Sequence, residues 1–368
     1  MTRSSRPPFR ADHVGSLLRP ERLKAARQKA QRGEISREAL TEIENEEIRR
    51  VVRRQQEIGL KAVTDGEFRR SWWHFDFLEG LDGVEGYAAE AGIQFQGVQT
   101  KPRGIRVTGR LGFSGHPMLE HFRFLKAVAG ESLPKMTIPS PSMLHFRGTV
   151  DPAVYPDEEE FFADLAATYR QVIRAFYEAG CRYLQLDDTS WGYLCSPEER
   201  ERIRQKGWDP DRLAERYAEA INRALAGRPP DLTVTMHICR GNFRSTWIAS
   251  GGYEPVAEVL FTQVAVDGFF LEYDSERAGG FEPLRYVRRP DLRIVLGLVT
   301  SKFGQLESPD LLRRRIEEAA KYVPLEQLCL SPQCGFASTE EGNLLTEEEQ
   351  WAKLHLVVEV ARQVWGDL

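Results

Sequence analysis

The chain has 368 residues, of which 41% are hydrophobic and 29% charged, and its formal net charge is −5. This length suits one large α/β domain, and the charge balance argues against a nucleic-acid partner. The sequence has no apolar run long enough to span a membrane, no secretion signal and an odd number of dispersed cysteines, so we expect a cytoplasmic protein without disulfides or a membrane partner.

Short apolar runs alternate with amphipathic helical patterns from end to end. The predicted strands, in chain order, are 9–14, 61–64, 104–107, 135–138, 182–186, 232–237, 268–272, 293–298 and 328–330. The clearest predicted helices are 36–58, 157–179, 209–226 and 309–322. This alternation predicts a parallel sheet, and we expect a single (β/α)8 TIM-type barrel over residues 1–368. Nine strands are one too many for such a barrel, so we expect residues 83–115 to be partly an inserted hairpin.

Polar side chains follow most of the predicted strands. In chain order they are His13, Gly15 and Ser16, then Asp65 and Glu67, Asp187 and Asp188, His237 and Cys239, Glu272, Ser301 and Lys302, and Cys334. The carboxyl ends of the strands of such a barrel meet on one face, where active sites gather. The sequence therefore predicts one polar pocket on that face.

His237 and Cys239 are two residues apart at a strand end, so their side chains point to the same side. With Glu272 and Cys334 they make a set of one nitrogen, one oxygen and two sulfur ligands, which favours zinc over magnesium or calcium. Taken alone, His237 and Cys239 are more often a core histidine and a buried cysteine. The position of all four residues at strand ends weighs against that interpretation.

The remaining polar residues each allow two interpretations. Glu67, Asp187 and Asp188 would bind a substrate ammonium group or move protons, or else cap helices and face solvent. The Gly15–Ser16 turn would present N–H groups to a carboxylate, although such turns are common. Trp72 begins an aromatic cluster that would line the pocket or simply belong to the core.

Several segments of the chain, taken in sequence order, resemble the catalytic C-terminal half of cobalamin-independent methionine synthase, particularly its short stand-alone relatives. The matching segments are 11–16, 63–67, 184–188, 236–239 with 242–243, 271–272 and 331–335. The resemblance implies a (β/α)8 barrel similar to that of uroporphyrinogen decarboxylase, and transfer of a methyl group to the thiol of homocysteine to give methionine. It implies Zn²⁺ on His237, Cys239, Glu272 and Cys334, and homocysteine bound by Gly15, Ser16, Glu67 and Asp187.

The chain departs from the family where the methyl donor binds. The family's Asp-x-His-Ser stretch, which supplies an acid for a folate donor, corresponds here to Leu298–Lys302, which has no histidine, and His145 stands in place of a pocket tryptophan. A folate donor needs its amine protonated before it leaves. We therefore expect slow or absent turnover with methyltetrahydrofolate and faster turnover with a sulfonium or a methylcorrinoid. Lys302, His13, His74 and His145 are the candidates for a replacement acid.

Other functions remain open at this point. Another zinc-dependent thiol alkyl transferase, such as an epoxide:coenzyme M transferase, takes an acceptor without an amine and would not need both Glu67 and Asp187. A non-catalytic barrel with a closed structural zinc site is another alternative, although structural sites usually draw their ligands from close spacing. A metal-free, decarboxylase-like barrel would leave Cys239 and Cys334 unexplained.

Overall fold

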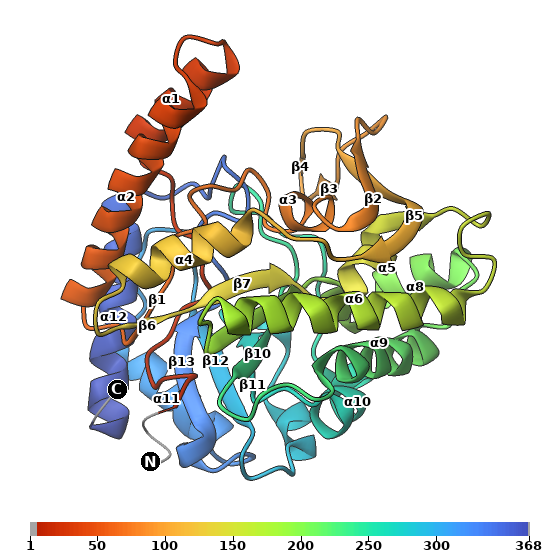
Figure 1. Cartoon of the computed structure of the whole chain (residues 1–368). Coiled ribbons are helices and arrows are strands. Elements are labelled where there is room, and N and C mark those ends of the chain that lie inside the picture. Colours follow the sequence, from red (N-terminus) through yellow and green to blue (C-terminus); the bar gives the residue numbers. More distant parts are fainter. Residues whose placement is uncertain (1–5, 367–368) are drawn as a thin grey trace.

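The computed structural model describes residues 6–366, and a parallel sheet surrounded by helices forms its centre (Figure 1). Six strands pair in the order β13-β12-β11-β10-β9-β7, all in parallel. Their bounds are β7 Met136–Pro139, β9 Tyr183–Asp188, β10 Thr233–Ile238, β11 Gly268–Glu272, β12 Arg293–Val299 and β13 Leu328–Pro332. Almost every residue of these strands is buried, as expected for a parallel sheet covered on both faces.

Two further segments continue the sheet around a circle. Strand β1 (Ala62–Val63) pairs in parallel with β6 (Leu133–Pro134), which runs directly into β7. On the other side, Ala11 forms a parallel bridge with Leu330 of β13. The N–H of Leu17 then donates to the carbonyl of Gly66, 3.0 Å away, just beyond β1. The predicted α/β barrel architecture is therefore confirmed, although the first predicted strand is reduced to a single bridge.

Helices cover the outside of the sheet. Those longer than two turns are α1 Glu21–Gln31, α2 Arg37–Glu57, α4 Met118–Val128, α6 Glu158–Glu178, α8 Pro197–Gln205, α9 Pro210–Leu225, α10 Glu254–Gln263, α11 Pro309–Ala319 and α12 Glu347–Trp365. Helices α6 and α9 begin where the predicted helices do, and Asp157 and Asp209 cap them, because each accepts an N–H two residues on, at 2.9 Å. Short elements complete the set: α3 Phe75–Leu78, α5 Ser142–Arg147, α7 Ser190–Cys195, and the 3₁₀ turns Glu276–Ala278, Glu282–Tyr286 and Leu325–Gln327.

A second, smaller β layer lies outside the parallel sheet. Strand β2 (Asp82–Tyr87) pairs antiparallel with β5 (Gly104–Gly112), and the hairpin of β3 (Gln94–Phe95) and β4 (Val98–Gln99) lies between them in sequence. Strand β5 also pairs in parallel with β8 (Gly148–Val150). The predicted strand 104–107 therefore belongs to this layer, which explains why nine strands were predicted for an eight-stranded barrel. We call residues 82–112 the insertion.

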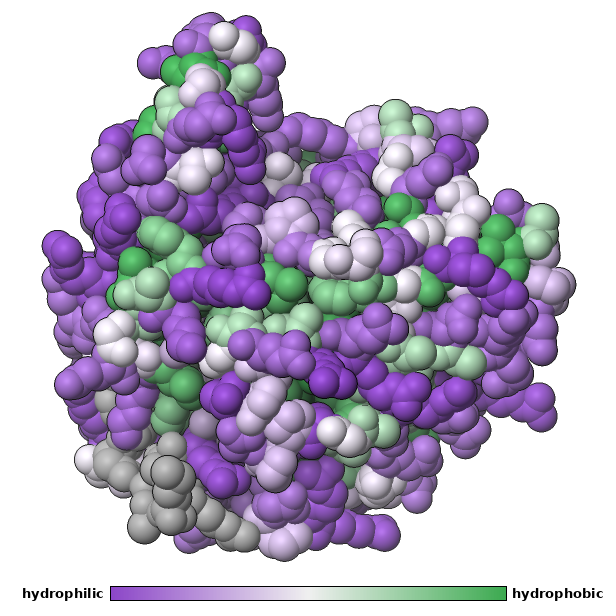
Figure 2. Space-filling view, viewed as in Figure 1, coloured by the Kyte–Doolittle hydropathy of each residue, from purple (hydrophilic) through white to green (hydrophobic). Residues whose placement is uncertain are grey.

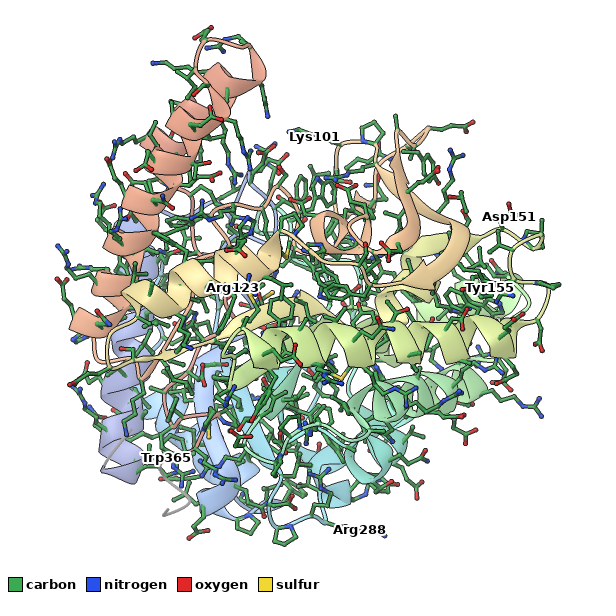
Figure 3. The ribbon with its side chains drawn as sticks, in the orientation of Figure 1. Lys101, Arg123, Asp151, Tyr155, Arg288 and Trp365 are labelled. Carbon is green, nitrogen blue, oxygen red and sulfur yellow. The ribbon has the colours of Figure 1, made fainter. Side chains whose placement is uncertain are left out.

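One side chain fixes the insertion to the helical shell. The hydroxyl of Tyr155 accepts the N–H of Leu111 and donates to Asp164 of α6, both at 2.8 Å. Figure 3 places Tyr155 beside Asp151 at the outer edge of this layer. The insertion thus has a fixed position relative to the barrel.

The face of the molecule seen in Figure 2 is mostly hydrophilic. In Figure 1 helices α1 and α2 project from the body, and in Figure 2 this projection and most of the visible face are hydrophilic. No helix within residues 6–366 is both long and apolar enough to cross a membrane.

Candidate metal and thiol site

The four predicted metal ligands meet at the carboxyl ends of the strands. His237 lies on β10, Glu272 ends β11, Cys239 follows β10 and Cys334 follows β13. Their ligand atoms all lie within 4.8 Å of one another, and the two sulfurs are 3.5 Å apart. Two sulfurs at about 2.3 Å from one tetrahedral zinc ion would be separated by about 3.8 Å. One ion would therefore reach all four side chains with little movement.

Two of the atoms that would face this ion, one on His237 and one on Glu272, have no hydrogen-bond partner in the described residues. Nδ1 of His237 is 3.3 Å from the carbonyl oxygen of Phe270, and Oε1 of Glu272 accepts the N–H of Arg240 at 2.9 Å. Nε2 of His237 and Oε2 of Glu272 are buried and have no partner in the described residues. Unpaired buried polar atoms are costly, and a zinc ion would satisfy both of these. The residues present therefore fit zinc.

The hydrogen bond between the two thiols makes them unequal. It lowers the pKa of Cys334 well below its usual value and raises the pKa of Cys239. Burial raises the pKa of Glu272. One thiolate therefore forms readily, and complete ionisation of the set requires a cation.

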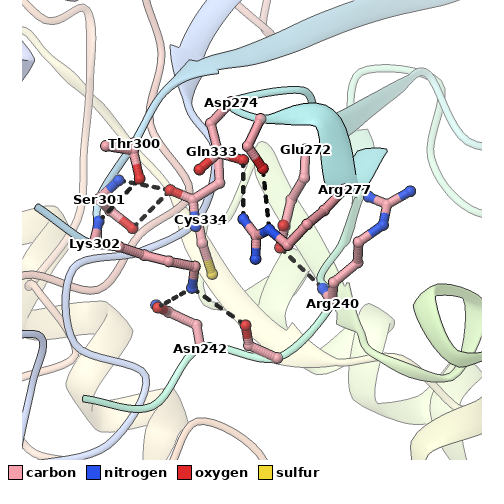
Figure 4. A network of polar contacts seen from close by, with 12 residues as sticks. Arg240, Asn242, Glu272, Asp274, Arg277, Thr300, Ser301, Lys302, Gln333 and Cys334 are labelled. Atoms are coloured by element: carbon pink, nitrogen blue, oxygen red, sulfur yellow. Dashed lines mark hydrogen bonds and ion pairs between the residues drawn. The ribbon is translucent and has the colours of Figure 1, made fainter. Parts of the chain in front are cut away.

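Positive groups surround this acidic set (Figure 4). Nζ of Lys302 donates to Oδ1 of Asn242 at 2.9 Å and to the carbonyls of Thr246 and Gly241 at 3.1 and 3.3 Å. Its charge acts on Cys239, Glu272 and Cys334. Lys302 is thus a fixed counter-charge that also ties together the loops after β10 and β12.

A pocket adjoins the ligand set. Three of the predicted metal ligands line this pocket: His237, Cys239 and Cys334. The polar residues next to them in the lining are Ser16, Glu67, Asp187 and Asp188. Gly15 lies outside this lining, and its φ of +147° is a backbone conformation that favours glycine. A Cβ at this position would lie 2.7 Å from Cγ2 of Thr137 and 3.3 Å from Oε1 of Glu67. Glycine at this position lets Glu67 approach the turn.

Glu67 and Asp187 present buried carboxylates to the pocket. Oε1 of Glu67 accepts the hydroxyl of Thr137 at 2.8 Å, whereas Oε2 has no hydrogen bond in the described structure and lies 3.7 Å from Arg70. Asp187 accepts an N–H of Gln185 at 2.7 Å, and burial, aided by the charge of Glu67, raises its pKa to about 7. Two buried carboxylates in one space favour a cationic ligand such as an ammonium group.

This geometry agrees with comparison to known proteins. Residues 9–363 match the family described as cobalamin-independent synthase, catalytic domain. The chain belongs to this family. The uncharacterized protein YxjH of Bacillus subtilis (strain 168) is 61% identical over 358 residues, covering 97% of this chain and 95% of that protein.

Two solved structures extend this family relationship. The putative vitamin-B12 independent methionine synthase from Listeria monocytogenes has a TM-score of 0.82 at 51% identity, covering 98% of this chain and 99% of that one. A B12-independent methionine synthase from Shewanella sp. W3-18-1, in complex with selenomethionine, has a TM-score of 0.73 at 19% identity, covering 96% and 97%. The second match supports the fold alone.

The other residues singled out in the sequence of this family member lie in different settings. Trp72 lines the pocket. Asp188 also lines it, but its two oxygens already accept the hydroxyls of Ser140, Ser142 and Ser190 and the N–H of Trp191. The structure therefore makes Asp188 an acceptor that holds neighbouring loops.

Three candidates for the donor side lie outside the pocket lining. His13 is buried at the end of the first strand segment, and burial lowers its pKa to about 4. His145 points away toward Tyr217, whose hydroxyl is 2.8 Å from Nδ1, and Glu158. Lys302 lies behind the ligand set, where its ammonium group is bound by the three acceptors described above. Helix α5 directs His145 outward, which the position of the residue in the sequence could not reveal.

The sequence analysis did not assign several residues that line the rest of the pocket. They are Ile93, Phe95 and Arg147, whereas Trp73 and His74 belong to the predicted aromatic cluster 72–75 and Phe243 to a segment that carries the family resemblance. The run Trp72–Phe75 was a signal for part of this wall. Ile93 and Phe95 come from the insertion and Arg147 from the end of α5, and no local pattern links these segments to the site.

Proposed function

We propose that this protein is a zinc-dependent methyltransferase that methylates the thiol of homocysteine and forms methionine. The observation that carries the proposal is the set of two adjacent thiols and two orphaned ligand atoms beside a pocket that contains Glu67 and Asp187. Membership of the cobalamin-independent synthase family supports it. The selenomethionine in the Shewanella relative, a selenium analogue of the proposed product, supports it further.

His237, Cys239, Glu272 and Cys334 would hold the zinc ion. When bound, zinc supplies a Lewis acid that favours the thiolate form of a substrate thiol at neutral pH. The protein itself would orient the amino acid. Oε2 of Glu67 and the carboxylate of Asp187 would accept hydrogen bonds from the ammonium group, while the hydroxyl of Ser16, whose oxygen accepts the N–H of Ala337 at 3.4 Å, would donate to the substrate carboxylate.

The reaction then consists of one bond exchange. The acceptor thiol loses its proton, its sulfur forms a bond to the methyl carbon, and the bond between that carbon and the donor breaks with its electron pair remaining on the donor. Glu67 and Asp187 would fix the position of the sulfur by holding the other end of the amino acid. Correct placement of two reactants is a large part of catalysis in such displacements.

The negative charges of the pocket disfavour the alternative acceptor, coenzyme M. A sulfonated thiol without an amine, such as coenzyme M, would leave Glu67 and Asp187 unpaired and would be repelled by them. The hydroxyl of Thr137 donates to Glu67 at 2.8 Å and a side-chain N–H of Gln185 donates to Asp187 at 2.7 Å, and these hydrogen bonds hold both carboxylates in place. An amino-acid thiol is therefore the favoured acceptor.

The test compares acceptors and metal states. Zinc-loaded protein is incubated with homocysteine or coenzyme M and, in separate reactions, methyltetrahydrofolate, methylcobalamin or S-methylmethionine, and products are identified by mass spectrometry. We expect methionine from homocysteine, and none after removal of zinc by a chelator. Absence of methionine with every donor, or equal methylation of coenzyme M, would refute the proposal.

A further inference from the structure

The part of the pocket wall not formed by the metal and thiol site is built from aromatic and apolar side chains. Trp72 and Trp73 come from the loop after β1, Phe95 comes from the insertion, and Phe243 comes from the loop after β10. The rings of Phe95 and Phe243 are 5.4 Å apart. We call this wall, with His74 and Arg147, the aromatic half. Its composition suits a flat ring, because aromatic side chains stack on ring faces.

His74 contributes two unused polar atoms to the aromatic half. The side chain is 2% exposed, and within residues 6–366 neither ring nitrogen has a hydrogen-bond partner. Burial, together with the charges of Arg147 and Arg103, lowers the pKa of His74 well below its usual value. The neutral imidazole therefore offers one N–H donor and one acceptor to whatever fills the pocket.

Arg147 contributes a cation without a counter-ion. Its Nη2 donates to the hydroxyl of Tyr193 at 2.7 Å, while its buried Nε has no partner and no carboxylate of the described chain forms an ion pair with it. Glu199, whose carboxylate senses the charge of Arg147, is itself paired with Arg202 at 2.7 Å. A pocket arginine in this state is suited to a ligand oxygen that carries negative charge.

The carboxylates of the pocket cannot offset this charge. Glu67 and Asp187 belong to the acceptor side, and both oxygens of Asp188 are occupied by three hydroxyls and one N–H. A sulfonium donor placed in the aromatic half would meet the guanidinium of Arg147 without a free carboxylate to balance it. A donor that bears anionic or carbonyl oxygens would meet complementary groups.

We propose that Arg147 and His74 form the donor-binding subsite, where they hold an anionic or carbonyl oxygen of a flat-ring methyl donor and select against sulfonium donors. This inference rests on the proposed methyltransferase function. It makes Arg147 a residue that determines donor specificity by charge. In contrast to the expectation drawn from the sequence, it favours the folate and corrinoid classes, which share a flat ring with acceptor oxygens, over the sulfonium class.

Equilibrium binding tests the subsite without requiring turnover. Methyltetrahydrofolate, methylcobalamin and S-methylmethionine are each titrated into the zinc-loaded protein, with quenching of the fluorescence of Trp72 and Trp73 as the signal. We expect at least one ring donor to bind about tenfold or more tightly than S-methylmethionine. Which ring donor does so identifies the source of the methyl group.

Variants assign that selectivity to Arg147. We expect Arg147→Met to weaken binding of the ring donor about 10- to 100-fold, the usual consequence of losing a charged hydrogen bond, and Arg147→Lys to retain part of the affinity. His74→Phe should weaken it several-fold. Arg106→Met is the matched control, because Arg106 forms an exposed ion pair with Glu85 on the insertion and should leave binding unchanged. Unchanged zinc content and melting temperature would show that each variant is folded.

The outcomes separate the subsite from the proposed function. Equal ring-donor affinity in wild type and Arg147→Met, or tighter binding of S-methylmethionine, would overturn the subsite even if methionine is formed. Arg147-dependent binding of a ring donor without methionine formation from homocysteine would instead support the subsite and refute the proposed function.

Discussion

The two halves of the pocket differ in how the chain builds them. The ligand set and the acceptor carboxylates lie at or just beyond the ends of paired strands, where the register places His237 opposite Asp187 and Phe270. The aromatic half comes from loops, the end of α5 and the insertion. Strand ends in a barrel are fixed by the hydrogen-bond ladder, whereas loops vary at little cost to the fold.

The halves also differ in charge. The metal and thiol half contains Glu67, Asp187, Glu272 and two thiols, and these acidic groups favour the binding of cations. The aromatic half contains Arg147 and a neutral His74, and these groups favour a ligand that has an acceptor oxygen. On the proposed function, the barrel would set the metal and the acceptor, while the loops and the insertion would set the donor. The predictions below perturb these two halves and the structure that supports them, from the largest expected effect to the smallest.

The largest effect is expected from loss of a metal ligand. Cys239→Ser and Cys334→Ser should each lower zinc affinity by more than about 100-fold, because even residues that only support a ligand contribute 10- to 100-fold. Elemental analysis gives the zinc content per chain, and methionine formation should fall with it. Cys181→Ala is the control: burial raises the pKa of Cys181 to about 12, and its thiol donates to the carbonyl of Tyr183. Full zinc occupancy in both serine variants would contradict the ligand assignment.

Acid should weaken the contact between α3 and the start of α4 through His116. Nδ1 of His116 accepts the N–H of Met118, and Nε2 lies 3.1 Å from the carbonyl oxygen of Phe77. Burial lowers the pKa of His116 from 6.5 to about 4, so the unfolded form takes up a proton at a pH where the folded form does not. The stability contributed is complete above pH 6.5 and is lost as the pH falls toward 4, by up to about 3 kcal/mol.

Hydrogen exchange at pH 5 and pH 7 measures this effect. Exchange in residues 75–80 and 116–121 should be faster at pH 5 in wild type, and His116→Gln should reduce the difference between the two pH values. Equal pH dependence in wild type and variant would show that another group is responsible.

Glu67→Gln should weaken homocysteine binding by about 1 to 3 kcal/mol, because it removes a charge that would pair with the ammonium group. Glutamine retains an oxygen for the hydroxyl of Thr137, so the local structure should persist. Isothermal titration with homocysteine and with a thiol that lacks the amine measures the difference. If wild-type protein binds the two thiols equally, the ammonium-binding role of Glu67 and Asp187 is wrong.

The smallest effect is expected at the anchor of the insertion. Tyr155→Phe removes two hydrogen bonds, to Leu111 and Asp164, at a cost of about 1 kcal/mol each at most. The melting temperature should fall slightly and binding of the ring donor should weaken, with zinc content unchanged. Loss of zinc in this variant would mean that the two halves are not separable.

Much of the barrel and the whole ligand set could be predicted from local patterns. A period of two places His237 and Cys239 on one side of a strand end, and the N-cap residues Asp157 and Asp209 mark helix starts, because these signals depend only on neighbours a few residues away. The family resemblance added the acceptor residues, whose roles remain proposals. The alternation of strands and helices gave the barrel, and the surplus strand indicated the insertion.

Tertiary packing alone decided the rest. The N–H of Gln96 donates to the carbonyl of Trp247 at 3.1 Å, which brings the insertion onto the loop after β10, and no local pattern encodes a contact between segments so far apart. Packing also turned His145 toward Tyr217, occupied both oxygens of Asp188 and left Arg147 without a counter-ion. Partner choice and burial set the charge and availability of a polar side chain, and both depend on which distant segments surround it.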